Sequence, residues 1–312
     1  MKEIHYLGPE GSYCEIATKK FLQLKEFEET EYKLVPCSSI LSVIENVDSL
    51  NNVIGVVPVE NSIEGPVRET LDNLARASSK VMISRETIVK VSHCLVTKAK
   101  KYDEIKTIIS YTQGLAQCKN FINRNMNPDV ELVTSKSTSE AIKLLIDQPE
   151  SYAAIGPEIA AQLYNLPILS KGINDQPENY TKFVMLGDNF SNTTGNDLTS
   201  IAIVLRNKPG ALVEILQPFS ENDINLCRIE SRPSKKNLGE YVFFIDFNGH
   251  IQDENVKATI GKIAPNVDSY RFLDLMCLKM IVQLGVNLKE YLFVIDSISD
   301  VDDILYEKFK SV

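Results

Sequence analysis

The chain has 312 residues, of which 44% are hydrophobic and 24% charged, and its formal net charge is -9. This balance is typical of globular proteins, and the length allows two domains. The acidic charge argues against broad nucleic-acid or anionic-membrane binding, because both require basic surfaces. We find no membrane-spanning apolar run and no signal-peptide pattern, so we expect a cytoplasmic protein that does not bind membranes.

The cysteines and histidines are scattered and lack metal-ligand spacing. They are Cys14, Cys37, Cys94, Cys118, Cys227 and Cys277, together with His5, His93 and His250. We expect free, buried thiols rather than disulfides or zinc ligands, and packed or surface histidines. A metal site and a histidine-based nucleophilic mechanism are therefore poorly supported, although folding can bring distant residues together.

The first 190 residues alternate between strand-like and helix-like segments. Strands are predicted at 3–7, 32–36, 53–59, 86–97, 107–110, 130–134, 152–155 and 181–187. Helices are predicted at 12–24, 39–47, 66–77, 113–123, 137–147 and 157–164. This alternation is typical of an α/β fold with mostly parallel sheets. Two such runs, joined by the long strand 86–97, indicate two lobes with a cleft.

A small and polar stretch at 189–198 reads as a linker to a second unit. There, strands are predicted at 199–206, 226–231, 241–248 and 268–275, and helices at 211–222 and 254–263. This is the βαββαβ order of a ferredoxin-like domain. The remaining residues, 276–312, form an extension for which the sequence indicates no role.

Three polar motifs follow predicted strands, where ligands bind in open α/β sheets, and a fourth precedes a predicted strand. The first contains Gly11, Ser12 and Glu15, whose spacing also fits an ordinary tight turn and helix cap. In the second, Asn61 and Ser62 follow a buried strand. Their side chains can donate hydrogen bonds to a carboxylate, although both residue types also favour turns.

The third motif begins at Ser110, the end of a predicted strand. Thr112 is a plausible helix N-cap, and Gln113 and Gln117 share a helix face. A further pair, Ser137 and Glu140, has capping-box spacing, for which we favour a structural role.

The fourth motif runs from 174 to 183 as a polar turn leading into an apolar strand. Thr181 and Lys182 point to opposite faces if this segment is extended. By spacing alone, the segment is a loop that contains an ordinary lysine.

Together, the motifs GPEGSYCEIA, PVENSIEGPV, SYTQGLAQC and NYTKF resemble those of prephenate dehydratases, in the same order, from residue 3 to about 187. The resemblance implies a two-lobed catalytic domain like a periplasmic binding protein, at 1–188, with the active site between the lobes. It also implies the reaction, in which prephenate loses water and CO₂ to give phenylpyruvate. This chemistry requires no cofactor and no metal.

The resemblance assigns roles to individual residues. Thr181 is the hydrogen-bond donor to the leaving hydroxyl. The other implied catalytic and substrate-binding residues are Ser110, Gln117, Glu60, Asn61, Ser62 and Lys182. The family usually has arginine where Lys182 stands, and lysine cannot form the same bidentate clamp on a carboxylate. It commonly has His-Pro where this chain has Tyr111-Thr112.

The second unit, at 199–275, resembles an ACT regulatory domain through the motifs NKPGAL and IESRP. The resemblance implies feedback inhibition by L-phenylalanine bound between subunits of a homodimer or homotetramer. The implied contacts are Gly210, Ala211, Leu212, Glu230, Ser231 and Arg232. Gly210 permits close backbone approach at a helix start, where a carboxylate is favoured. The family's Gly-Ser-Tyr-Pro ending is absent from this chain.

Two alternatives remain open. Arogenate dehydratase acts on an amino analogue of prephenate, and the sequence does not separate the two substrates. A non-catalytic amino-acid-binding regulator with the same fold is favoured by Lys182, whereas Thr181 with the ENS and LAQC motifs favours an enzyme. The strength of inhibition does not follow from the sequence.

Overall fold

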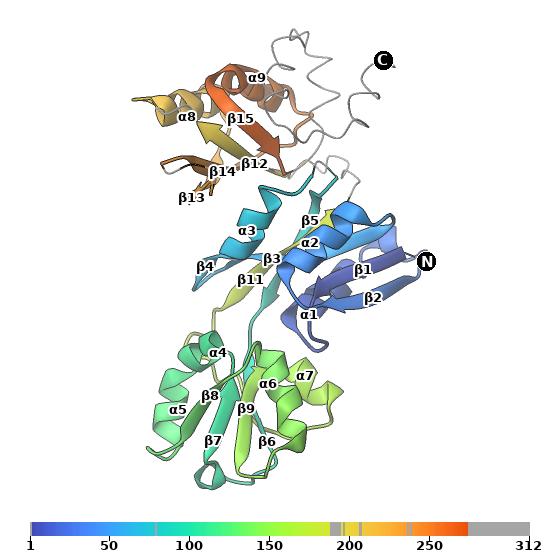
Figure 1. Ribbon diagram of the computed structural model, residues 1–312, viewed down its shortest axis with the longest axis vertical. Helices are drawn as coiled ribbons and strands as arrows, with labels where there is room; N and C mark the ends of the chain where they lie inside the picture. The colour runs from blue at the N-terminus through green and yellow to red at the C-terminus, as the bar shows by residue number, and fades with distance from the viewer. Residues whose placement is uncertain are drawn as a thin grey trace. The chain divides into compact units, whose positions relative to one another are not determined.

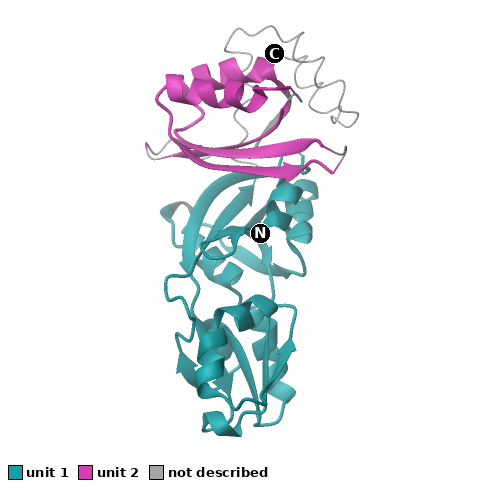
Figure 2. Cartoon of the chain, turned by 90° about the vertical axis from the view of Figure 1, so that its left-hand side faces the viewer, with its two compact units in different colours: residues 1–188 teal, residues 189–312 magenta. Residues whose placement is uncertain are grey.

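The computed structural model describes residues 2–78, 80–187, 195, 197–205, 208–235, 237 and 239–273. The chain divides into two compact units, residues 1–188 and 189–312 (Figure 2). Most of the expected linker at 189–198 and the whole expected extension at 276–312 lie outside the described residues.

The first sheet of the first unit has the strand order β2-β1-β3-β11-β5, with a short β4 paired to β3 (Figure 1). Its strands are β1 (Lys2–Leu7), β2 (Tyr32–Cys37), β3 (Val53–Asn61), β4 (Gly65–Pro66), β5 (Met82–Lys90) and β11 (Tyr180–Gly187). The helices of this lobe are α1 (Tyr13–Phe21), η1 (Lys25–Phe27), α2 (Ile40–Ser49) and α3 (Arg68–Leu74). Strand β1 is parallel to β2 and β3, whereas β11 is antiparallel to β3 and β5.

The second sheet has the order β10-β6-β9-β7-β8. Its strands are β6 (His93–Thr97), β7 (Thr107–Ser110), β8 (Glu131–Thr134), β9 (Tyr152–Pro157) and β10 (Ile168–Lys171). The helices of this lobe are η2 (Tyr102–Glu104), α4 (Thr112–Gln117), α5 (Lys119–Asn125), α6 (Thr138–Leu144), η3 (Leu145–Asp147) and α7 (Glu158–Leu163). Strand β7 is parallel to β8 and β9, whereas β6 is antiparallel to β9 and β10.

These sheets confirm the predicted two-lobed α/β fold and correct two of its details. The expectation of mostly parallel sheets is wrong, because both sheets are mixed. The single strand predicted at 86–97 is also wrong, since β5 ends at Lys90 and β6 begins at His93. Between them the chain passes from one sheet to the other, and the Val91 amide donates to the Asn179 carbonyl at 2.8 Å.

Serine side chains begin three of the helices, and the sequence spacing predicts this for Ser12 and Ser137. Ser12, Ser39 and Ser137 each accept a hydrogen bond from a backbone amide of the first turn. The helix predicted at 113–123 is instead the two helices α4 and α5, which meet at Cys118. Thr112 is the first helical residue and not the N-cap, because Tyr111 occupies that position.

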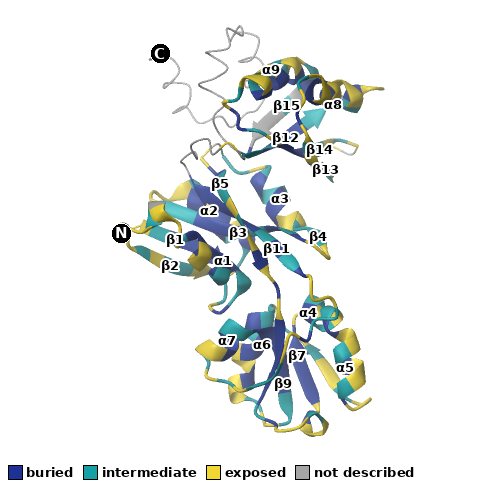
Figure 3. Cartoon of the chain, turned by 180° about the vertical axis from the view of Figure 1, so that it is seen from behind, coloured by how far each residue is buried: buried dark blue, intermediate teal, exposed yellow. Residues whose placement is uncertain are grey.

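Apolar side chains fill both faces of the central strands, which are mostly buried (Figure 3). In the first lobe, Ile4 and Tyr6 of β1 pack with Phe21 of α1 and Phe183 of β11. Removing such side chains from water is the main favourable contribution to folding. The core therefore fixes the strand ends that carry the polar motifs.

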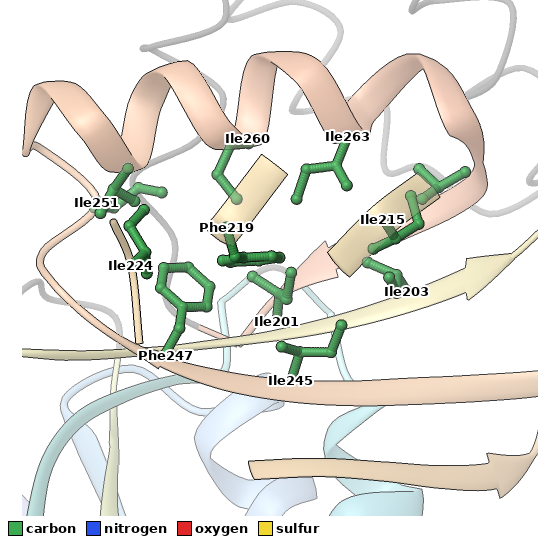
Figure 4. Packing of buried hydrophobic residues seen from close by; sticks show 12 residues of the cluster. Ile201, Ile203, Ile215, Phe219, Ile224, Ile245, Phe247, Ile251, Ile260 and Ile263 are labelled. Atoms are coloured by element: carbon green, nitrogen blue, oxygen red, sulfur yellow. The ribbon is translucent and has the colours of Figure 1, made fainter. Parts of the chain in front are cut away.

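The second unit is an antiparallel sheet of order β13-β14-β12-β15 with helices on one face. Its elements are β12 (Leu198–Leu205), α8 (Ala211–Glu221), β13 (Leu226–Pro233), β14 (Tyr241–Asn248), α9 (Glu254–Ile263), η4 (Ala264–Asn266) and β15 (Val267–Phe272). Isoleucines of both helices pack with Phe219 and Phe247 against the sheet (Figure 4). The predicted βαββαβ order is confirmed.

The described cysteines are free, but not all of them are buried. Cys14, Cys94 and Cys118 lie in the core, as expected. Cys37 is only partly buried and Cys227 is exposed, so the expectation of buried thiols is wrong for these two. Cys277 lies outside the described residues.

Candidate active site

The polar motifs converge where the chain crosses between the lobes of the first unit. Strand β3 ends at Asn61, and β11, its antiparallel neighbour, begins at Tyr180. Antiparallel pairing places Asn61 opposite Thr181. The segment that leads into β11 comes from the second lobe, which contributes Gln117 of α4.

Asn61 is the centre of a buried hydrogen-bond network. Its side-chain oxygen accepts from the amides of Ile63 and Glu64, both at 3.0 Å, which fixes the orientation of the amide group. Its Nδ2 donates to Asn179 Oδ1 at 2.8 Å and to Thr181 Oγ1 at 2.9 Å. The Asn61 side chain thus provides an acceptor for two backbone amides of the turn after β3. It also orients the side chains of Asn179 and Thr181 on the neighbouring segment.

Thr181 is left with a proton to donate. Its oxygen accepts from Asn61 Nδ2, and within the described part of the chain no protein group accepts its hydroxyl proton. The residue is 9% exposed, so only a ligand in close contact reaches this donor. This is the geometry that assistance to a leaving group requires.

Asn179 connects the two lobes. It is fully buried, and its Nδ2 donates to Gln117 Oε1 at 2.9 Å. Gln117 Nε2 in turn donates to Glu64 Oε1 at 3.3 Å, a long hydrogen bond on the exposed side of the network. The Gln117 amide is therefore oriented with its donor group toward the exposed side.

His93 holds the Gln117 carbonyl from a second direction. Its Nε2 lies 3.2 Å from Gln117 Oε1, and its ring is 2% exposed. Burial lowers the pKa of His93 to about 4, so the ring is neutral at pH 7. Because the Gln117 carbonyl only accepts, Nε2 carries the proton. Tyr13 packs edge-on against this ring and donates to the Ser92 carbonyl at 2.7 Å.

Ser62 and Ser110 have different surroundings. Ser62 is exposed, and its Oγ accepts from the Tyr180 amide at 2.9 Å. Ser110 is fully buried and donates to the Ile155 carbonyl at 2.7 Å. A Cβ on Gly114 would approach Ser110 Oγ to 2.6 Å, so α4 begins directly over this serine. Ser110 therefore supports the helix that carries Gln117.

Lys182 is not brought together with Thr181. The two residues are consecutive in an extended strand, so their side chains point to opposite faces of the sheet. Lys182 Nζ lies 3.4 Å from Glu86 Oε2, and Glu60 is its neighbour on β3. Lys182, which the resemblance assigns to substrate binding, thus has the two acidic residues Glu86 and Glu60 as neighbours.

Asn179, His93 and Tyr13 are the site residues that the sequence analysis does not identify. Asn179 belongs to the NYTKF motif, which marks it as a candidate site residue. The spacing of residues within the motif does not predict which side chains Asn179 contacts. Its contacts with Asn61 and Gln117 span 118 and 62 positions. Contacts at such separations come from the tertiary fold and not from a local pattern.

The predicted effector-binding residues lie on two elements of the second unit. Gly210 is the N-cap of α8 with φ +83, a left-handed conformation that favours glycine. Ala211 and Leu212 form the first turn of that helix. Glu230, Ser231 and Arg232 lie within the edge strand β13 rather than in a loop at its end.

Among the residues that the structure describes, no group of three or more His, Cys, Asp or Glu side chains is arranged to hold a metal ion. The described helices include none that is long and apolar enough to cross a membrane.

Comparison with known proteins gives consistent matches. The family model for prephenate dehydratase matches residues 4–191, and the model for the ACT domain matches residues 199–265. A prephenate dehydratase of Methanocaldococcus jannaschii is 41% identical over 280 residues, which cover 88% of this chain and 97% of the relative.

Solved structures agree with this match. The prephenate dehydratase of Arthrobacter aurescens in complex with L-Phe is 30% identical, with a TM-score of 0.77 and coverage of 87% of this chain and 88% of that chain. The prephenate dehydratase of Staphylococcus aureus is 26% identical, with a TM-score of 0.71 and coverage of 88% and 98%.

Proposed function

The chain belongs to the prephenate dehydratase family and is a hydro-lyase with an ACT domain, and we propose that the network centred on Asn61 is its active site. The observation that carries this proposal is the Thr181 hydroxyl, which accepts from Asn61 and keeps its own proton for a ligand. Asn61, Gln117 and Thr181 come from both lobes and meet through Asn179.

The reaction needs little more than positioned donors. The bond between the prephenate ring and its carboxylate breaks, and its electron pair passes through the ring to expel the hydroxyl on the opposite carbon. CO₂ leaves, the ring becomes aromatic, and phenylpyruvate remains. A threonine hydroxyl is too weak an acid to lose its proton outright. Thr181 therefore stabilises the departing hydroxide through a hydrogen bond.

Gln117 and Ser62 are the proposed contacts for the substrate carboxylates. Among the described residues, the one partner of Gln117 Nε2 is the exposed side chain of Glu64 at 3.3 Å, which a substrate carboxylate can replace. Ser62, which follows Asn61 in the chain, offers an exposed hydroxyl. Ser110 acts from beneath α4 and positions Gln117. Lys182 and Glu60 are left out of this assignment, because they are register partners on the face of the sheet opposite Thr181, where Lys182 also contacts Glu86.

We extend the proposal to regulation by L-phenylalanine. Gly210 to Leu212 and Glu230 to Arg232 are its proposed contacts, between subunits of a homodimer or homotetramer. The complex of the Arthrobacter aurescens relative with L-Phe supports this assignment. We also propose the domain limits 1–188, 199–275 for the ACT domain, and 276–312 for the extension, in a cytoplasmic enzyme.

Replacing Thr181 with valine tests the proposed active site. Thr181→Val keeps the shape and removes the donor, so kcat should fall by about 10²-fold or more with a smaller change in KM. The measurement is ultraviolet detection of phenylpyruvate formed from prephenate. Thr134→Val, on an exposed position of β8, is the matched control and should retain kcat.

The same assay separates the alternatives. Arogenate as substrate gives phenylalanine instead of phenylpyruvate, so the ratio of kcat/KM values identifies the preferred substrate. Near wild-type kcat for Thr181→Val would remove Thr181 from the leaving-group role.

A further inference from the structure

The segment between β10 and β11, residues 172–179, contains two polar residues that the proposed active site does not use, Asn174 and Asp175. Their side chains accept from backbone amides that are 81 and 55 positions away along the chain. Asp175 lies at the junction of α4 and α5, and Gln117 is the last residue of α4. The segment that brings Asn179 to the site therefore also contacts the helix that carries Gln117.

The Asp175 carboxylate caps α5 from outside that helix. Cys118, at the N-cap position, makes no side-chain hydrogen bond to the helix. Asp175 Oδ2 instead accepts from the Asn120 amide at 2.9 Å, and its Oδ1 accepts from the Phe121 amide at 3.3 Å. Amides in the first turn of a helix have no acceptor within the helix. The start of α5 is thus held by a residue of a distant segment.

Asp175 also holds the end of α4. Its backbone amide donates to the Gln117 carbonyl at 2.8 Å. Further along the same segment, Asn179 Nδ2 donates to Gln117 Oε1 at 2.9 Å. Gln117 is therefore held by one short segment at both its backbone and its side chain. Because of this, a shift of Asp175 changes where the Gln117 amide lies relative to Asn179.

Asn174 fixes the second partner of the Gln117 side-chain carbonyl, which is His93. Asn174 Oδ1 accepts from the His93 amide at 2.6 Å, and the Ile173 amide donates to the His93 carbonyl at 3.0 Å. His93 Nε2 in turn lies 3.2 Å from Gln117 Oε1. The consecutive residues 173–175 thus hold the backbone of both His93 and Gln117.

We propose that Asp175 is a positioning residue for the dehydratase reaction, which acts by placing the Gln117 amide for the substrate. The inference rests on the proposed role of Gln117 as a substrate contact. A cap for α5 alone could come from a local side chain, as serines provide for α1 and α6. Here the cap comes from the segment that continues to Asn179 and Thr181. One segment therefore sets the positions of donors from both lobes.

A double-mutant cycle in kcat/KM tests this proposal, with the full-length chain and prephenate as substrate. Asp175→Ala removes the carboxylate and should lower kcat/KM by about tenfold. The loss should be mainly in KM, because Gln117 contacts the substrate before the reaction as well as during it. In a Gln117→Ala background, Asp175→Ala should change kcat/KM by less than about twofold, because the group that it positions is gone.

Ser39→Ala is the matched control. Ser39 caps α2, a helix of the first lobe that carries none of the proposed site residues. Both substitutions remove a cap and should lower the free energy of unfolding in urea, but Ser39→Ala should leave kcat and KM unchanged. If Asp175→Ala does not fold, Asp175→Asn takes its place. It keeps one acceptor oxygen and should lower kcat/KM by about threefold.

The outcomes separate this proposal from the proposed active site. Additive losses in the cycle would overturn the positioning role of Asp175 and leave the role of Gln117 intact. Wild-type kcat and KM in a folded Asp175 variant would overturn it as well. If the single variant Gln117→Ala keeps wild-type kinetics, the proposed role of Gln117 is wrong, and the positioning role of Asp175 is wrong with it.

Discussion

His93 is a buried imidazole that has no charged partner within the described part of the chain. Its ring contacts Gln117 and Tyr13, both of them neutral groups. Gln117 accepts from Asn179, which in turn accepts from Asn61. A proton added to this ring would have to be carried in a nearly water-free site, which is why burial lowers the pKa of His93 to about 4. Protonation would also place a second donor on Nδ1, 3.4 Å from the Tyr13 hydroxyl oxygen, which allows only a long hydrogen bond to a neutral group.

Protein stability should consequently fall as the pH drops from 6.5 to 4. In this window the unfolded histidine binds a proton and the buried His93 does not, so protons favour unfolding. The free energy of unfolding that is lost in this way reaches about 3 kcal/mol once the pH is below about 4. Urea denaturation at pH 7 and pH 4.5 measures it. His93→Gln should lose less stability than the wild type between these two pH values, and equal losses would contradict this assignment.

At the scale of elements, the loop between β1 and α1 packs tightly against α7 of the other lobe. Gly11 has φ +79, and a Cβ there would lie 2.8 Å from the Ala160 backbone Cα. Ser139 adds a hydrogen bond from its hydroxyl to the Gly11 carbonyl at 3.0 Å. Glycine is therefore required here for its backbone conformation and for its lack of a side chain.

A pair of alanine substitutions separates these two requirements. Gly172 is also left-handed, with φ +64, but a Cβ there would meet nothing within 4 Å. Gly172→Ala should lower the free energy of unfolding by about 1–2 kcal/mol through backbone strain alone. Gly11→Ala should lower it by a further 1–3 kcal/mol or so, because the new methyl group collides with α7. Equal losses in urea denaturation would mean that α7 moves away freely.

Local sequence patterns predict helices and strands well where the whole predicted segment belongs to a single lobe or unit. The strands at 53–59 and 241–248 and the helix at 254–263 follow from apolar periodicity, and the structure has them with small shifts of their ends. The wrong strand prediction lies where the chain crosses from the first lobe to the second. Residues 86–97 are continuously strand-like, yet they serve two sheets, because the break at Val91 and Ser92 is set by the partners of each half.

Dependence on tertiary partners also explains which site residues can be predicted from the sequence. Asn61 and Gln117 stand in motifs at strand and helix ends, where a ligand site is expected. His93 lies within an apolar run and looks like a core histidine. Its contact with Gln117 depends on how β6 and α4 pack, which no spacing rule describes.

At the scale of the whole molecule, regulation requires that phenylalanine bind one conformation of the enzyme better than another. A coupling free energy of roughly 1–3 kcal/mol would be ordinary for such control. The proposed effector site depends on the backbone at Gly210, where φ is +83. A carboxylate at this position would meet the positive end of the α8 dipole. The first amides of a helix have no acceptor within the helix, and that of Ala211 makes a long bond of 3.3 Å to the Lys208 carbonyl.

Gly210→Val should therefore weaken phenylalanine inhibition and binding. A β-branched residue is strained in this conformation and would cover the amides. Gly239→Val is the matched control, since Gly239 has φ +86 and equally open surroundings on the loop before β14. Calorimetry with the full chain should show binding for the control and a loss of about tenfold or more in affinity for Gly210→Val. No heat with the wild type at millimolar phenylalanine would mean that the sensor is absent.

Strands β5 and β11 pair directly, so the second lobe, residues 91–179, is inserted between two neighbouring strands of the first sheet. Tyr180 lies opposite Lys90, so the chain leaves the first lobe and returns to it at adjacent points of one sheet. Excision of residues 91–179 could be closed by a tight turn, which would convert β5 and β11 into a simple hairpin. Such a shortened protein would keep Asn61 and Thr181 in register and lose Asn179 and Gln117. The proposed site thus needs both lobes, because Asn61 and Thr181 belong to the sheet that stays and Asn179 and Gln117 to the segment that is removed.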